Sequence, residues 1–105
     1  MKIEILYVAD CPHYVPAVEL VEQILQEEGV RAEIQTTQIC DQAAAAEAKF
    51  PGSPTIRVNG HDVEARGPGS DPAVVGCRLY PDSGGIPSVE TVRRAVRAER
   101  QREGL

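Results

Sequence analysis

The hydrophobic pattern of the first third of the chain changes from continuous to helical and then to alternating. Residues 2–8 form a short, nearly unbroken apolar run with no helical period, which is typical of a strand buried on both faces. From about residue 13 to 28, apolar residues recur at helical spacing, and Gly29 follows as a C-cap residue. Residues 30–37 alternate in polarity and predict a second strand.

The segment Asp10-Cys11-Pro12 separates the first strand from the first helix. Proline is favoured in the first turn of a helix, where its missing N–H has no intrahelical partner to lose. We therefore expect Pro12 in that first turn, with Asp10 or Cys11 as the N-cap.

The rest of the chain predicts a short helix, a hairpin and a final helix. Residues 40–49 are alanine-rich, with an acidic residue early and a lysine late, which suits the helix dipole. Residues 55–64 contain two short strand-like runs around Asn59-Gly60, the strongest short hairpin signal. Ser88 then precedes three valines at helical spacing and predicts the cap of the last helix.

These elements predict one α/β domain over residues 1–105, in the order β-α-β-α-β-β-α. A right-handed crossover makes the first two strands parallel, and the hairpin adds antiparallel strands to the other edge. We expect a mixed four-stranded sheet flanked by helices on both faces. The Gly/Pro-rich stretch 65–87 predicts an extended loop, and loops of this length are often functional.

Charge and composition narrow the classes of molecule that this protein is expected to bind. The net charge is -5 and the pI is about 5.0, which argues against nucleic acid or an anionic membrane as partners. No apolar run reaches the ~18 residues of a membrane helix, and no signal peptide is recognisable, so a cytoplasmic location is expected. A cluster of arginines near the C-terminus is interleaved with glutamates and predicts a salt-bridged, solvated helix face. Its members are Arg93, Arg94, Arg97, Arg100 and Arg102.

Several local features resemble the thioredoxin-like superfamily. Cys11 follows the first strand and opens the first helix, where that superfamily carries its nucleophilic cysteine. Ser53-Pro54-Thr55 precedes the third strand, where the superfamily carries a cis-proline after a small or hydroxyl residue. The predicted hairpin turn also follows in the expected place. The resemblance covers most of residues 1–64 and the last helix, and it implies a thioredoxin-like fold.

The resemblance is to a monothiol relative. Thioredoxins and glutaredoxins present C-x-x-C, whereas the stretch from Cys11 to Tyr14 reads C-P-H-Y, so tyrosine stands in place of the resolving cysteine. His61-Asp62 stands where glutaredoxins carry a Gly-Gly-Asp-type segment, and we expect both residues to be exposed polar residues of the hairpin. The chain is also similar to small thioredoxin-like proteins found near mercury-handling functions.

Cys11 is the candidate nucleophile, because a helix N-terminus favours the reactive thiolate form of cysteine. His13 is a candidate thiolate partner and Tyr14 a candidate hydrogen-bond donor. The alternatives are a cap-position cysteine without chemistry, a solvated histidine and a packed tyrosine. The resemblance implies a cis bond at Pro54, which would put the backbone of Ser53 beside Cys11.

An extended substrate could pair with that backbone by β-augmentation. Ser53, Pro54 and Thr55 are therefore candidate substrate-binding residues, the alternative being a trans turn proline. Cys40 and Cys77 are candidates to release a mixed disulfide on the nucleophile, or else small buried hydrophobes.

We predict no cofactor and no resident metal site, since the spacing of the three cysteines matches no zinc pattern. The predicted function is thiol–disulfide exchange with a protein or a small-molecule thiol or disulfide. One alternative is a soft-metal or mercurial binding protein, because converging thiolates suit Hg(II) or Cu(I). Another is an interaction domain without thiol chemistry that uses the 65–87 loop. The sequence leaves the oligomeric state undefined.

Overall fold

The computed structural model describes residues 1–64, 75, 76, 78, 80 and 85–104. Within them the elements are β1 (Lys2–Tyr7), α1 (Tyr14–Glu28), β2 (Glu33–Gln38), α2 (Gln42–Ala48), β3 (Thr55–Val58), β4 (His61–Asp62) and α3 (Val89–Glu103). The order is the predicted one. No helix in this part of the chain has the length and apolar character that a membrane span requires.

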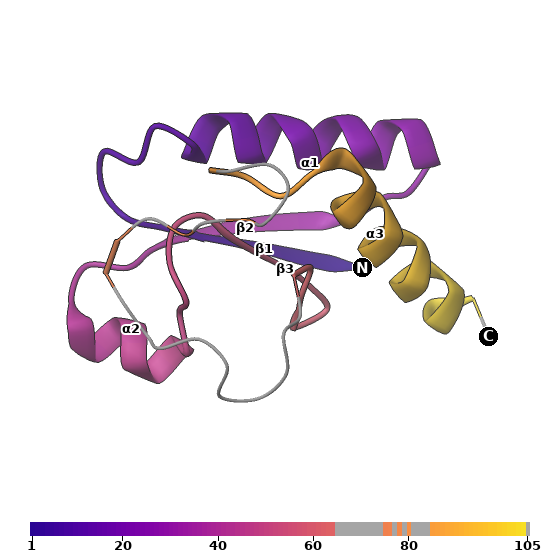
Figure 1. Ribbon diagram of the computed structural model, residues 1–105. Coiled ribbons are helices and arrows are strands. Elements are labelled where there is room, and N and C mark those ends of the chain that lie inside the picture. Colours follow the sequence, from indigo (N-terminus) through magenta and orange to yellow (C-terminus); the bar gives the residue numbers. More distant parts are fainter. Residues whose placement is uncertain (65–74, 77, 79, 81–84, 105) are drawn as a thin grey trace.

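The strands form one sheet in the order β2-β1-β3-β4, as Figure 1 shows in outline. β1 is parallel to β2, with Tyr7 opposite Gln38. β1 is antiparallel to β3, with Ile5 opposite Ile56, and β4 pairs antiparallel with β3. The predicted mixed four-stranded sheet is confirmed.

Helices cover both faces of the sheet, with α1 and α3 on one side and α2 on the other (Figure 1). Successive residues of a strand point to opposite faces, so β1 serves two cores. Ile5 belongs to the larger core with Val21 of α1 and Val96 of α3. Leu6 belongs to a smaller core with Phe50, beside α2. The continuous apolar run of β1 is therefore explained by burial on both faces.

Two local predictions in the second half of the chain are confirmed. Asn59 and Gly60 both have positive φ, at 52° and 85°, as a type I′ hairpin turn requires. Ser88 caps α3 by accepting a hydrogen bond from the Thr91 N–H. Val89, the first of the three valines, is 46% exposed and lies outside the core.

The start of α1 differs from the prediction. The N-cap is His13, and its side chain makes no capping hydrogen bond. Pro12 therefore precedes the helix instead of lying in its first turn, and neither Asp10 nor Cys11 is the cap. Pro16 lies at the third helical position, where its missing N–H still has no intrahelical partner to lose.

The arginines of α3 pair with glutamates at the end of α1. Arg97 Nε lies 2.8 Å from Glu28 Oε1, and Arg93 Nη2 lies 2.7 Å from Glu27 Oε1. The hydrogen bond from Arg97 holds the pKa of Glu28 below its ordinary value. The predicted salt-bridged helix face is confirmed, and its main partners come from a second helix.

Candidate functional site

Cys11 lies in the turn between β1 and α1, three residues before the first helical residue. Its thiol is free and partly buried. Asp10, just before it, has a φ of 59°, in the left-handed region. The carbonyl oxygen of Cys11 accepts a hydrogen bond from the Tyr14 N–H at 3.3 Å. The turn thus fixes the backbone of Cys11 ahead of the N-terminus of α1.

The two residues expected to assist the thiol are both packed against the protein. The Tyr14 ring stacks on Tyr7, with ring centroids 3.8 Å apart and planes 19° from parallel. The His13 ring lies against Gly85, where an added Cβ would come 2.3 Å from His13 Nε2. A side chain at residue 85 would therefore displace the His13 ring. The start of α1 thus packs against the segment before α3.

The Ser53-Pro54-Thr55 bend lies beside the end of β1. The Ser53–Pro54 peptide bond is cis, as predicted. Ser53 Oγ accepts a hydrogen bond from the Val8 N–H at 3.1 Å, which ties the bend to the strand that leads to the cysteine turn. Thr55 Oγ1 donates to the carbonyl oxygen of Gly52 at 2.6 Å. Ser53 and Thr55 are fully buried, and their hydroxyls have partners within the protein.

The backbone of Ser53 is also hydrogen-bonded within the chain. Its N–H donates to the carbonyl oxygen of Gly76 at 2.7 Å, and its carbonyl oxygen accepts from the Arg78 N–H at 2.9 Å. Gly52 has a φ of 136°, and an added Cβ would come 2.9 Å from the backbone of Arg78. A glycine is thus required where the two segments meet.

A buried arginine anchors this contact. The Arg78 side chain is 4% exposed, and its Nη1 lies 2.8 Å from Asp62 Oδ2. Its Nη2 donates to the Glu64 carbonyl oxygen at 3.1 Å, and its Cζ lies 4.8 Å from the centroid of the Tyr80 ring. Nε is buried without a hydrogen-bond partner. The expectation that Asp62 is an exposed hairpin residue is wrong, because it pairs with a buried cation.

Tyr80 extends the same network towards the proline bend. Its hydroxyl donates to the carbonyl oxygen of Pro54, and burial raises the pKa of Tyr80 well above its ordinary range. Sequence reasoning missed Arg78 and Tyr80. The one available signal was an arginine two residues before a tyrosine in a Gly/Pro-rich stretch. Nothing in that stretch indicates that the arginine pairs with residue 62.

Among the described residues, Cys11 and Cys40 are not joined by a disulfide. Cys40 is exposed and free, and its Sγ lies 3.9 Å from the Gln38 carbonyl oxygen. The chain leaves β1 towards α1 and leaves β2 towards α2, on opposite faces of the sheet (Figure 1). Cys77 lies outside the described residues. Among those described, no three His, Cys, Asp or Glu side chains form a group that could hold a metal ion.

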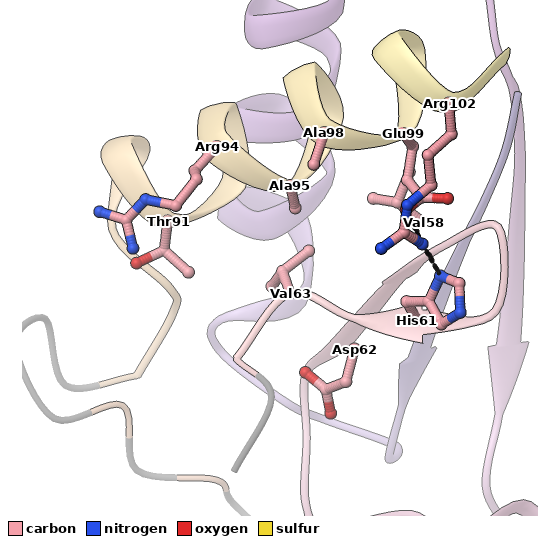
Figure 2. Close-up of a pocket in the computed structure, with 10 residues that line it drawn as sticks. All are labelled: Val58, His61, Asp62, Val63, Thr91, Arg94, Ala95, Ala98, Glu99 and Arg102. Carbon is pink, nitrogen blue, oxygen red and sulfur yellow. Dashed lines mark hydrogen bonds and ion pairs between the residues drawn. The ribbon is translucent and has the colours of Figure 1, made fainter. Parts of the chain in front are cut away.

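A separate pocket lies between the β3–β4 hairpin and α3 (Figure 2). Valine and alanine side chains form much of its lining. At one end, Glu99 Oε2 lies 3.4 Å from His61 Nδ1 and 2.9 Å from Arg102 Nη1. None of the sequence-predicted site residues that the structure describes lines this pocket. The candidate site therefore consists of the cysteine turn and the neighbouring proline bend.

No family model, curated protein or solved structure matches the chain. Its described residues form a small mixed α/β domain with a four-stranded mixed sheet and three helices.

Proposed function

We propose that this chain is a thioredoxin-like thiol protein that performs thiol–disulfide exchange through Cys11. The sheet order β2-β1-β3-β4 and the turn between β1 and α1 support this proposal. The observation that carries it is the hydrogen bond between the Val8 N–H and Ser53 Oγ. That bond holds the Ser53–Pro54 bend beside the strand end from which Cys11 emerges.

The proposed exchange has two steps. The Cys11 thiolate attacks one sulfur of a disulfide RSSR, forming a Cys11–S–SR mixed disulfide and releasing RS⁻, which takes a proton from solvent. A thiolate R′S⁻ then attacks the R sulfur, releasing RSSR′ and restoring the Cys11 thiolate. One disulfide is consumed and one is formed, and the thiol R′SH supplies the electrons that leave as RSH. If Cys40 or Cys77 supplies the second thiolate instead, it attacks the Cys11 sulfur, releases RS⁻ and leaves an intramolecular disulfide, which two external thiols then reduce.

Cys11 precedes the positive end of the α1 dipole by three residues in the sequence. The turn holds it ahead of the N-terminus of α1, whose cap makes no side-chain hydrogen bond. The positive end of a helix dipole favours a nearby anion. Cys40 offers a comparison within the same chain, because it is the more exposed of the two thiols. Accessibility alone therefore predicts faster reaction at Cys40, whereas activation by the site predicts faster reaction at Cys11.

The test is stopped-flow reaction with 2,2′-dithiodipyridine at neutral pH, followed by release of thiopyridone. We expect a fast phase that Cys40→Ser retains and that Cys11→Ser loses. Mass spectrometry of the quenched protein identifies the residue modified in that phase. A fast phase that survives in Cys11→Ser would contradict the proposal. Circular dichroism of each variant checks that the fold is intact.

The same variants separate the proposal from its two rivals. A soft-metal or mercurial binding protein predicts tight Hg(II) binding that requires Cys11 together with a second cysteine. An interaction domain without thiol chemistry predicts that Cys11→Ser leaves the function of the protein intact. Exchange chemistry instead predicts a mixed disulfide on Cys11 that a small thiol such as 2-mercaptoethanol removes.

A further inference from the structure

We infer that Gly76 and Arg78 occupy the backbone groups of Ser53 that an extended polypeptide would need, so that Cys11 acts on low-molecular-weight disulfides and thiols. This inference rests on the proposed function and names its substrate class. It concerns the bend beside the cysteine turn, where strand-like pairing with a substrate is otherwise expected.

Both backbone groups of Ser53 are already in use. A residue has one N–H and one carbonyl for pairing with a neighbouring strand. The Ser53 N–H bonds the Gly76 carbonyl oxygen at 2.7 Å, and its carbonyl oxygen bonds the Arg78 N–H at 2.9 Å. An incoming peptide would therefore exchange two existing hydrogen bonds for two equivalent ones, with no gain in number.

The space beside the bend is also filled. An added Cβ on Gly52 would come 2.9 Å from the Arg78 backbone, which is closer than the side chain of any L-residue tolerates. A second strand cannot enter between segments that leave no room for a methyl group. Docking would require the segment that carries Arg78 to leave.

Departure of that segment would break several buried contacts. Arg78 would lose its ion pair with Asp62 and its hydrogen bond to the Glu64 carbonyl oxygen. The hydroxyl of Tyr80 would lose the carbonyl oxygen of Pro54. A small disulfide needs none of these changes, because it requires only that one sulfur reach the partly exposed Cys11.

The test compares two substrates with the same leaving group. One is the 5-thio-2-nitrobenzoate mixed disulfide of N-acetylcysteine methylamide, and the other carries that disulfide on the central cysteine of an extended, uncharged octapeptide. Two new backbone hydrogen bonds would favour the peptide by roughly tenfold or more. We expect the wild-type protein to react with both at the same rate, within about threefold.

A peptide that reacts tenfold faster than the small disulfide would overturn the inference while leaving exchange at Cys11 intact. Slow reaction with both substrates, unchanged in Cys11→Ser, would instead refute the proposed function and the inference with it. In Arg78→Ala, which removes the anchor, we expect the peptide rate to rise relative to the small-disulfide rate.

A second measurement does not depend on thiol chemistry or on the folding of Arg78→Ala. Amide hydrogen exchange of wild-type protein is expected to be slow at Ser53 and Arg78, and unchanged by an excess of the octapeptide in its thiol form. Tyr80→Phe, which removes only the hydroxyl, is expected to speed exchange at both amides. Exchange at Ser53 as fast as at the exposed turn residue Gly60 would show that the groups are free and would overturn the inference.

Discussion

Arg78→Ala should destabilise the protein more than any substitution of an exposed arginine. The guanidinium is 4% exposed and faces the Asp62 carboxylate, whose side chain is 23% exposed. Truncation leaves that carboxylate without its partner and removes the donor to the Glu64 carbonyl oxygen. It also removes the group that lies 4.8 Å over the Tyr80 ring.

The magnitude follows from these contacts. Breaking a buried ion pair by removing one partner costs about 3–5 kcal/mol. Partial exposure of Asp62 lets water reach its carboxylate once Arg78 is gone, which places the cost at the lower end. Removing the buried, unpartnered Nε offsets part of the loss of packing and of the Glu64 hydrogen bond. We therefore expect a loss of about 3 kcal/mol, against a total of about 5–15 kcal/mol for a domain.

The assay is equilibrium urea unfolding followed by far-ultraviolet circular dichroism. With a slope of about 1.5 kcal/mol per molar, the midpoint should fall by about 2 M. Arg97→Ala is the matched control, because Arg97 is 58% exposed and its partner Glu28 keeps Arg93 and Arg100 within ion-pair distance, so its midpoint should fall by less than about 0.7 M. Arg78→Lys should recover part of the loss, since an ammonium restores the charge opposite Asp62 but has no second nitrogen to reach the Glu64 carbonyl oxygen. A midpoint for Arg78→Ala equal to that of the control would refute the reasoning.

Three further predictions concern the same region. Burial raises the pKa of Tyr80, so the stability gained from its buried neutral hydroxyl is complete below the unfolded pKa of about 10 and is lost as the pH rises above that value. Between about pH 9 and pH 11, the free energy of unfolding in urea should fall more steeply for wild type than for Tyr80→Phe. Parallel falls in the two proteins would contradict this prediction. Gly52→Ala meets the Arg78 backbone at 2.9 Å with φ at 136°, so it should cost more than about 1 kcal/mol in the same assay, and an unchanged midpoint would disprove the close approach. Gly85→Ala should displace the His13 ring, because the added Cβ would come 2.3 Å from Nε2. The NMR resonances of His13 should shift, and those of the other histidine should stay in place. The loss in free energy of unfolding should be below about 1 kcal/mol, because the ring can rotate away.

Local chemistry made several elements predictable. Asn59-Gly60 can adopt the two positive φ values of a tight hairpin, and Ser88 carries the oxygen that a helix N-terminus needs. The apolar run of β1 required cover on both faces, which in turn required helices on both sides of the sheet. These features depend on residues that are neighbours in the sequence, so a pattern can reveal them.

The start of α1 was predicted less well, although it lies in a well-patterned region. Proline is compatible with several positions around a helix N-terminus. Pro12 and Pro16 therefore did not define which residue is the cap, and the structure places His13 there. As a result, the cysteine lies ahead of the helix end instead of forming it.

The sequence by itself determined the order of the elements and the place of Cys11 after the first strand, because both follow from periodicity and turn chemistry. Only the tertiary structure decided that the backbone of Ser53 is already paired and that Arg78 lies buried against Asp62, sixteen residues away. No periodic pattern links two residues so far apart in the chain. Their contact depends on how the hairpin, the proline bend and the later segment pack together in space.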